Sequence, residues 1–519
     1  MTIPQPPQAA PHPGSPLMPR WNLGELPAPP VFSRHRLGAM LGPGLMMAGA
    51  AIGGGEWLLG PSVGARYGGA LLWVATISLI AQFVYNIEAS RYTLYSGEPV
   101  MTGKFRTFPG PLAWFFLYLV IDLGALLPYM VASVATPVAA IYLGRIPDPS
   151  NPSHVSLLQW LTYAMLVVSL LPLIFGGKVY NALKALMTVK FVVVFSFLLF
   201  VAVFYSSWHT WWEIGSGLLR FGNVPTPNGG TINVFQSLWR DGALPALDTE
   251  SLTVLTAFAA IAGVGGLAQT SISNYTRDQG WGMGAIVGAI PSLIGGRHLA
   301  LSHVGSVFRL SPESLARWRG WIKHVVFDQA IVWLPASVIG LALPTMLSVE
   351  FLPRGTVANQ WVMAGMTADG VAGRVGGVIG ALCWYMILIS GFLVLLPNAA
   401  TNADAFIRRW IDVAWTGLPA LRTWDTHHIR YLYFAFVVCY FVIGVFFLSI
   451  ARPLQLIILY GNIGNLALGI SCWHVLYVNL TLLPPELRPR WPARIGMVLA
   501  GLYFTGMALL TGAIMLGWV

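Results

Sequence analysis

Long apolar stretches that are almost free of charge recur along the whole chain, and they restrict both its solvent and its fold. Hydrophobic residues make up 56% of the 519 residues and charged residues only 9%, which excludes an ordinary water-soluble domain. About twenty apolar residues are needed for a helix to cross a bilayer. Because every backbone polar group must be satisfied inside lipid, these stretches predict an all-α polytopic membrane protein.

Eleven stretches reach the length of a membrane-spanning helix. They are residues 38–65, 68–95, 112–143, 156–176, 183–207, 251–276, 327–349, 374–400, 430–450, 453–480 and 494–517. A further stretch, 281–308, is partly apolar but contains Pro291, Arg297 and two histidines. If it does not cross and the N-terminus is cytoplasmic, 21 of the 29 Lys and Arg residues fall in cytoplasmic loops and 7 in outer loops, as the positive-inside rule expects. We therefore expect residues 277–326 to form a long, basic cytoplasmic loop.

The first stretch is interrupted by three glycines and a carboxylate, Gly53, Gly54, Gly55 and Glu56. A charge at membrane depth costs about 2.5–3.5 kcal/mol on insertion scales, so it is rarely kept without a partner or a polar cavity. The glycines favour a break in the helix, and the backbone groups that a break frees are tolerated only where they line a cavity. These residues predict a binding site in mid-membrane.

The sixth stretch has a second interruption near its middle. Gly263, Gly265 and Gly266 are followed by the polar residues Gln269 and Thr270. Paired interruptions at corresponding places in two halves of a chain are typical of inverted-repeat transporters. Close helix packing at small residues is the alternative explanation for the glycines. The first interpretation predicts two five-helix repeats.

The expected organisation follows from these two breaks. It comprises a disordered, Pro-rich cytoplasmic tail (1–36), a first five-helix repeat (37–210), an extracellular loop (211–250), a second five-helix repeat with the basic loop (251–480) and a final transmembrane helix (481–519). We expect a monomer in the cell membrane, the inner membrane of a bacterium, with a cytoplasmic N-terminus.

The residues around the first break form a recognisable series. It runs from Gly42-Pro43-Gly44 through Gly53-Gly54-Gly55-Glu56-Trp57 to Ala65-Arg66-Tyr67-Gly68 and Leu71-Leu72-Trp73-Val74. Over residues 40–106 the chain resembles the Nramp divalent-metal transporters, and a weaker collinear similarity continues downstream. The resemblance implies a LeuT-type fold, an inverted 5+5 repeat plus one extra helix, with alternating access at unwound helices 1 and 6.

The chain departs from that family at the ligand positions. Gly53 to Glu56 stand where Nramp proteins have Asp-Pro-Gly-Asn, and Leu267 to Thr270 align with the family's Met-Pro-His-Asn. Since a methionine sulfur favours soft transition metals, its loss removes the reason to expect Mn²⁺ or Fe²⁺ selectivity. The remaining donors, with Glu56 and Gln269 as predicted metal ligands and Thr270 beside them, are all oxygen and suit a hard ion such as Mg²⁺.

Proton coupling is expected to be weak or absent. Asp122 matches the family's helix-3 aspartate, but Ala125 replaces the glutamate that follows it and Gln269, which does not titrate, replaces a histidine. Asp122 is therefore either a coupling or gating residue or one half of a helix-packing ion pair.

Other polar residues in the apolar stretches have simpler explanations. Glu88 and Arg91 are spaced to form an i,i+3 ion pair, and Lys190 can snorkel toward an interface or serve a function. The polar run from Asn398 to Asp404 predicts either the lining of an inner vestibule or a helix cap.

Together these features predict a secondary transporter or facilitator of a cation, most simply a hard divalent ion. A small cationic or zwitterionic organic solute, its ammonium held by Glu56, fits the same residues. No GxxxxGK[ST], HExxH or nucleophile elbow is present, so an ATP-driven pump or an enzyme is not expected, nor is a cofactor. The net charge of +10 lies in loops between the spans, so the expected partners are the cargo and the lipid bilayer and not nucleic acid.

Overall fold

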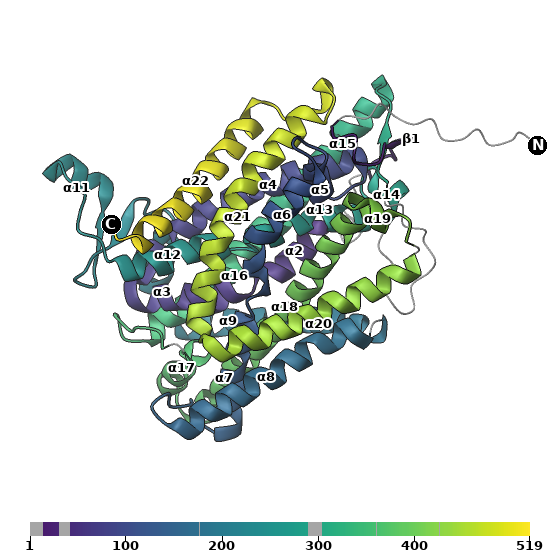
Figure 1. Cartoon of the computed structure of the whole chain (residues 1–519). Coiled ribbons are helices and arrows are strands. Elements are labelled where there is room, and N and C mark those ends of the chain that lie inside the picture. The colour runs from purple at the N-terminus through teal and green to yellow at the C-terminus, as the bar shows by residue number, and fades with distance from the viewer. Residues whose placement is uncertain are drawn as a thin grey trace, which may run out of the picture.

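The computed structural model consists almost entirely of helices, most of them running along one common direction (Figure 1). It describes residues 14–30, 42–175, 177–288, 304–359, 361–424 and 426–518. The helices are α2 (Pro43–Ala51), η2 (Gly55–Leu59), α3 (Gly60–Tyr67), η3 (Gly68–Leu71), α4 (Trp73–Ser96), α5 (Val100–Phe105), α6 (Pro111–Ile121), η4 (Leu123–Leu126), α7 (Tyr129–Leu143), α8 (Pro152–Phe175), α9 (Gly177–Tyr205), α10 (Trp208–Gly217), α11 (Val234–Asp241), α12 (Thr249–Ile261), η5 (Gly266–Thr270), α13 (Ser271–Asp278), α14 (Gly284–Val287), α15 (Pro312–Asp328), η6 (Gln329–Trp333), α16 (Leu334–Phe351), η7 (Met363–Gly365), α17 (Ala368–Val375), α18 (Gly377–Gly417), α19 (Pro419–Arg422), α20 (Thr426–Ile450), α21 (Pro453–Thr481), η8 (Pro485–Leu487) and α22 (Trp491–Met515). Four short strands, β1 (Asn22–Gly24), β2 (Asn223–Pro225), β3 (Thr231–Asn233) and β4 (Ser306–Phe308), form two pairs.

Each of the eleven predicted stretches coincides with a helix or a broken helix. Within the described residues, 8 helices are long and apolar enough to cross a membrane, or 9 if Gly55–Leu71 and Trp73–Ser96, which meet at a bend of 96°, count as one span. The described apolar part of α9, Val189–Tyr205, is shorter. The chain is therefore a multi-pass, all-α membrane protein, as predicted.

Both predicted helix breaks are present. α2 ends at Ala51, and Ile52 leaves the helical region with φ −77° and ψ 83°. α12 ends at Ile261, after which Gly263 and Gly265 adopt φ of 97° and 75°. Such positive φ values are strained for residues with a side chain, so these glycines permit the second break.

The predicted cytoplasmic loop 277–326 is wrong in its last third. α15 begins at Pro312 and continues through η6 into α16, giving one helix of 40 residues. Ser311 explains the start, because its hydroxyl accepts from the Ser314 amide at 3.1 Å while the Ser314 hydroxyl accepts from the Ser311 amide at 2.8 Å, a capping box before a proline. The charged residues of α15 make this segment too polar to stand out as an apolar stretch. Residues 289–303 lie outside the described part of the chain.

The predicted disorder of residues 1–36 is wrong for residues 14–30, which we call the N-terminal strap. β1 pairs in parallel with β4, with Asn22 opposite Ser306. Trp21 is 1% exposed, and the Arg106 guanidinium lies 4.8 Å from the centre of its ring. The strap is thus folded against the end of the bundle that carries α14 and α15 (Figure 1).

Side chains from α15 and from Arg106, the residue after α5, hold the backbone of the strap. Arg106 donates to the Pro19 carbonyl at 2.7 Å, Arg317 donates to the Leu26 carbonyl at 2.7 Å, and the Trp321 indole donates to the Pro27 carbonyl at 2.8 Å. Prolines lack an N–H but keep a carbonyl acceptor. A Pro-rich composition therefore suggested disorder, although it leaves acceptors that basic and indole side chains can bind.

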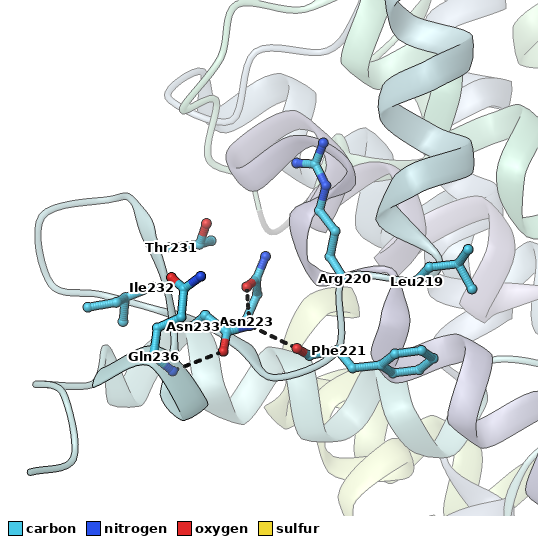
Figure 2. A pocket seen from close by; sticks show the side chains of 8 residues that line it. All are labelled: Leu219, Arg220, Phe221, Asn223, Thr231, Ile232, Asn233 and Gln236. Atoms are coloured by element: carbon cyan, nitrogen blue, oxygen red, sulfur yellow. Dashed lines mark hydrogen bonds between the residues drawn. The ribbon is translucent and has the colours of Figure 1, made fainter. Parts of the chain in front are cut away.

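The predicted extracellular loop 211–250 is also structured. α10 already begins at Trp208, and a hairpin of β2 and β3 precedes α11. Asn233 fixes this hairpin by donating to the Phe221 carbonyl at 2.8 Å and to Asn223 Oδ1 at 3.0 Å (Figure 2).

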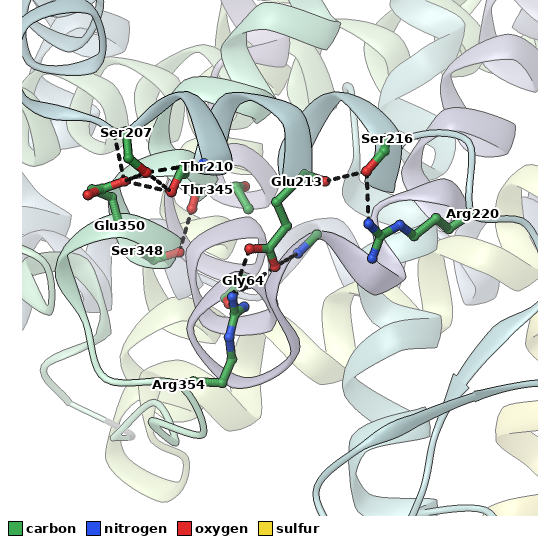
Figure 3. A network of polar contacts seen from close by, with 11 residues as sticks. Gly64, Ser207, Thr210, Glu213, Ser216, Arg220, Thr345, Ser348, Glu350 and Arg354 are labelled. Carbon is green, nitrogen blue, oxygen red and sulfur yellow. Dashed lines mark hydrogen bonds and ion pairs between the residues drawn. The ribbon is translucent and has the colours of Figure 1, made fainter.

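α10 clamps this end of the bundle through two carboxylates (Figure 3). Glu213 accepts from Arg354 Nη2 at 2.8 and 2.9 Å and from the Gly69 amide at 3.1 Å. Glu350, at the end of α16, accepts from the Thr210 hydroxyl at 2.6 Å and from the Ser207 amide at 3.0 Å. The clamp joins α10 to the turn after α3 and to the end of α16.

Trp21→Ala is expected to release the strap while the helices stay folded. Truncating a buried Trp costs about 3–5 kcal/mol, and Trp21 is the largest of the three buried side chains of the strap, the others being Met18 and Leu26. Hydrogen exchange of the detergent-purified protein should show faster exchange in residues 14–30, with α4 and α21 still protected. Leu17→Ala removes a side chain that is 56% exposed and is the matched control. Equal protection of the strap in the wild type and Trp21→Ala would contradict the assignment.

Candidate functional site

The two helix breaks lie against each other in the interior. A Cβ added to Gly55 would lie 2.1 Å from the Ile261 carbonyl oxygen, and one added to Gly54 would lie 2.3 Å from the ring of Tyr129. Both distances are far below van der Waals contact. Glycine at these positions therefore allows the first break to approach the backbone of the second.

Glu56 joins the two breaks. Its Oε2 accepts from the Gly53 amide at 3.1 Å and its Oε1 accepts from the Gly263 amide at 2.7 Å, and the residue is 1% exposed. Charge-assisted hydrogen bonds of this kind are stronger than neutral ones. The carboxylate therefore satisfies one freed amide from each broken helix, and each of its oxygens keeps a lone pair for a further ligand.

Gln82 on α4 satisfies the second break from the other side. Its Nε2 donates to the Ala262 carbonyl at 2.6 Å and its Oε1 accepts from the Val264 amide at 3.3 Å. The sequence analysis did not identify this residue. In the sequence it is visible only as an amide side chain in the middle of the second apolar stretch.

Gln269 and Thr270 form hydrogen bonds with residues other than Glu56. Gln269 Nε2 donates to Asn86 Oδ1 at 2.5 Å, and the Thr270 hydroxyl donates to the Leu267 carbonyl at 2.7 Å. Asn86 in turn donates to Gln329 Oε1 at 2.8 Å. The contact with Asn86 uses the Gln269 amide nitrogen and not its oxygen, so the pairing of Glu56 with Gln269 as metal ligands stays a prediction.

A small cavity of about 20 Å³ lies at the breaks. It is lined by Gly53, Gly54, Gly55, Ile261, Gly263 and Val264 from the breaks, by Tyr129 and Met130 from α7, and by Asn398, Thr401 and Asn402 from α18. One water needs about 10–15 Å³ by this measure. The cavity in this conformation therefore admits one water or one bare ion and no organic solute.

Of the predicted site residues, Gly53, Gly54, Gly55 and Gly263 line the cavity, whereas Glu56, Gly265, Gly266, Gln269 and Thr270 are not in its lining. Asn398, Thr401 and Asn402 line the cavity, whereas Asp404 binds Arg408 and Tyr433. Met130 also lines the cavity, so the lining is not purely oxygen-based. Among the residues that the structure describes, no group of three or more His, Cys, Asp or Glu side chains could hold a metal ion.

Lys190 does not snorkel. Its Nζ donates to the Gly49 carbonyl at 2.9 Å, the Ile52 carbonyl at 3.1 Å and Asn398 Oδ1 at 2.9 Å, and the residue is 1% exposed. It thus binds the carbonyl of Ile52, while Glu56 binds the amide of the next residue, Gly53. Two opposite charges hold the two sides of the first break.

Asp122 forms a helix-packing ion pair, which was one of the two roles expected for it from the sequence. It accepts from Arg409 Nη2 at 2.7 Å and from the Trp410 indole at 2.8 Å. Arg409 also donates to the Leu267 carbonyl at 3.3 Å, at the second break. The predicted pair of Glu88 and Arg91 is also confirmed, at 2.9 Å.

A larger hollow of about 540 Å³ lies elsewhere, among residues 219–236 (Figure 2). It borders the β2–β3 hairpin and contains none of the predicted site residues. The small cavity at the breaks is therefore the candidate site.

Comparison with known proteins agrees with the architecture. No protein-family model matches the chain. A curated protein of Pasteurella multocida (strain Pm70), described as uncharacterized, is 35% identical over 72 residues, which are 14% of this chain and only 17% of that protein. The manganese transporter of Eremococcus coleocola, solved with an aromatic bis-isothiourea compound, is similar with a TM-score of 0.56 and 14% identity over 95% of this chain and 90% of its own.

Two solved variants of the same manganese transporter give TM-scores of 0.56 and 0.54 over the same shares of both chains. At 14% identity such a likeness concerns the path of the backbone. The expected LeuT-type fold is thereby confirmed.

Glu56→Ala is expected to destabilise the protein strongly. It leaves the buried amides of Gly53 and Gly263 without their acceptor, and each unsatisfied group costs about 1–3 kcal/mol. Thermal unfolding in detergent should show a clear loss for Glu56→Ala and a smaller one for Glu56→Gln, which keeps one acceptor oxygen. Glu250→Gln, at an exposed position, serves as the control. Wild-type stability of Glu56→Ala would refute the bridging role.

Proposed function

We propose that the protein is a secondary transporter or facilitator that moves a small cation by alternating access at its two broken helices. One observation carries the proposal: a buried carboxylate bridges the two breaks beside an ion-sized cavity. Broken helices with ion sites at their interface are the usual substrate-binding device of such transporters.

The electrostatics of the cavity favour a cation over an anion. α2 and α12 both end at the breaks, and the C-terminal end of a helix carries partial negative charge. The amide and hydroxyl side chains of Asn398, Thr401 and Asn402 add oxygen donors. Glu56 and Lys190 offset each other's charge at the first break, so the helix ends and the neutral oxygens carry this preference.

A hard divalent ion such as Mg²⁺ is the leading cargo. The polar side chains of the lining, those of Tyr129, Asn398, Thr401 and Asn402, carry oxygen, which Mg²⁺ prefers, and the structurally similar Eremococcus coleocola protein is a manganese transporter. Met130 adds one soft donor, so Mn²⁺ belongs in the same test. The small cavity argues against the organic solute that the sequence left open.

Weak or absent proton coupling is part of the proposal. Asp122, the candidate coupling residue, is held in hydrogen bonds by Arg409 and Trp410. Gln269 offers no proton. In this proposal Asp122 takes part in gating through its ion pair with Arg409. The pair connects the end of α6 to α18, and Arg409 also reaches the second break.

We place the protein in the cell membrane as a monomer with its N-terminus in the cytoplasm. The strap, the basic helix α15 and α19 lie at one end of the bundle, and the C-terminus lies at the other (Figure 1). Basic residues gathered at one end mark the cytoplasmic side. The clamp formed by α10 then faces outward.

Proteoliposomes that contain the wild type are expected to take up Mg²⁺, and Glu56→Gln should lower the initial rate at least tenfold, about 1.4 kcal/mol in the barrier. Mn²⁺, Na⁺ and small amines are assayed in parallel, with internal pH recorded and Glu250→Gln as the control. Uptake of none of these ions, or equal uptake by Glu56→Gln, would refute the proposed site. Acidification of the lumen in proportion to ion uptake would refute weak coupling.

A further inference from the structure

The ammonium group of Lys190 is buried near the middle of a membrane helix. The residue is fourteenth among the 29 residues of α9 and is 1% exposed. Among the described residues it has no carboxylate within ion-pair distance. A buried charge without a counter-ion is costly unless polar groups replace its hydration. At Lys190 that role falls to neutral oxygens.

Three neutral oxygens surround the ammonium. They are the Gly49 and Ile52 carbonyl oxygens at 2.9 and 3.1 Å and Asn398 Oδ1 at 2.9 Å. The Asn398 amide also donates through Nδ2 to the Ile52 carbonyl at 2.7 Å, which fixes the direction of Oδ1. The carbonyls belong to the last turn of α2 and the residue that follows it. The oxygens are therefore positioned by the backbone break and by α18, and not by Lys190 itself.

This arrangement has the composition of a monovalent-cation site. Carbonyl oxygens at an unwound helix, together with the negative end of a half-helix, are the groups that coordinate Na⁺ in broken-helix membrane proteins, and carbonyl oxygens can replace the hydration shell of K⁺. In this chain the place of such an ion is filled by a covalently attached ammonium. We propose that Lys190 is a built-in cation that occupies a monovalent-cation site between α2 and α18.

The assignment explains why Lys190 and Glu56 lie on the two sides of the first break. The first break frees both a carbonyl at Ile52 and an amide at Gly53, and a cation on the former complements Glu56 on the latter. Because the cation is attached to α9, the site is filled at any external Na⁺ concentration. The stability of the wild type is therefore independent of Na⁺ and NH₄⁺ beyond the general effect of salt.

Lys190→Ala tests the proposal by emptying the site. Purified protein is unfolded thermally in chloride salts of N-methylglucamine, Na⁺, K⁺ or NH₄⁺ at equal ionic strength. In N-methylglucamine, which is too large to enter, Lys190→Ala should unfold at a lower temperature than the wild type. Added Na⁺ or NH₄⁺ should then raise its midpoint saturably by roughly 2 °C or more, with no such response in the wild type.

Two further variants identify the site. Lys190→Met fills the space of the lysine stem without a charge and should show no cation response. Adding Asn398→Ala to Lys190→Ala removes one of the oxygens and should weaken or abolish the response. A response of equal size in the wild type, in Lys190→Met or in the double variant would overturn the proposal.

If Lys190→Ala is poorly folded, Lys190→Ser is measured in its place. It keeps a hydroxyl oxygen near the site and carries the same expectation. If neither variant is stabilised by Na⁺, K⁺ or NH₄⁺ in any of these buffers, an external cation cannot replace the ammonium and the proposal is wrong. No transport is measured, so the result stands whether or not the protein moves a cation.

Discussion

The structure depends on how two helices can be broken inside a membrane without leaving backbone groups unsatisfied. Lipid offers no partner for a free amide or carbonyl, so each break has to be repaired by side chains. Glu56 accepts from one amide of each break, Gln82 binds a carbonyl and an amide of the second, and Lys190 binds two carbonyls of the first. The same three residues thus supply partners for the backbone groups of both breaks.

These side-chain contacts also determine the net charge at the site. Glu56 and Lys190 bind adjacent backbone groups with opposite signs, so together they add no net charge to the first break. A cation that binds beside them is attracted by oriented oxygens and helix ends more than by formal charge. Such a site holds an ion less tightly than a cluster of carboxylates does, which suits a step in which the ion must also leave.

The sequence predicted the breaks well and their side-chain partners poorly. Glycines beside a carboxylate in an apolar stretch indicate an interruption locally, within a few residues. Whether Gln269 turns toward Glu56 or toward Asn86 depends on the packing of α4 against α13, which no local pattern records. The same limit applies to Gln82, whose role depends on a break 180 residues later. By contrast, Ser311 and Pro312 were a readable start signal for α15 that a search for apolar stretches overlooked.

The two ends of the bundle are fastened by ion pairs of different kinds. At the end clamped by α10, Arg354 remains 48% exposed in its pair with Glu213, whereas at the strap end the side chains of Arg106 and Glu98 are 0% and 3% exposed. Dissolved salt screens exposed charges within about 10 Å at 0.1 M and reaches buried ones far less. Ionic strength therefore acts on the two ends unequally: a saline medium loosens the α10 end and leaves the strap end almost untouched.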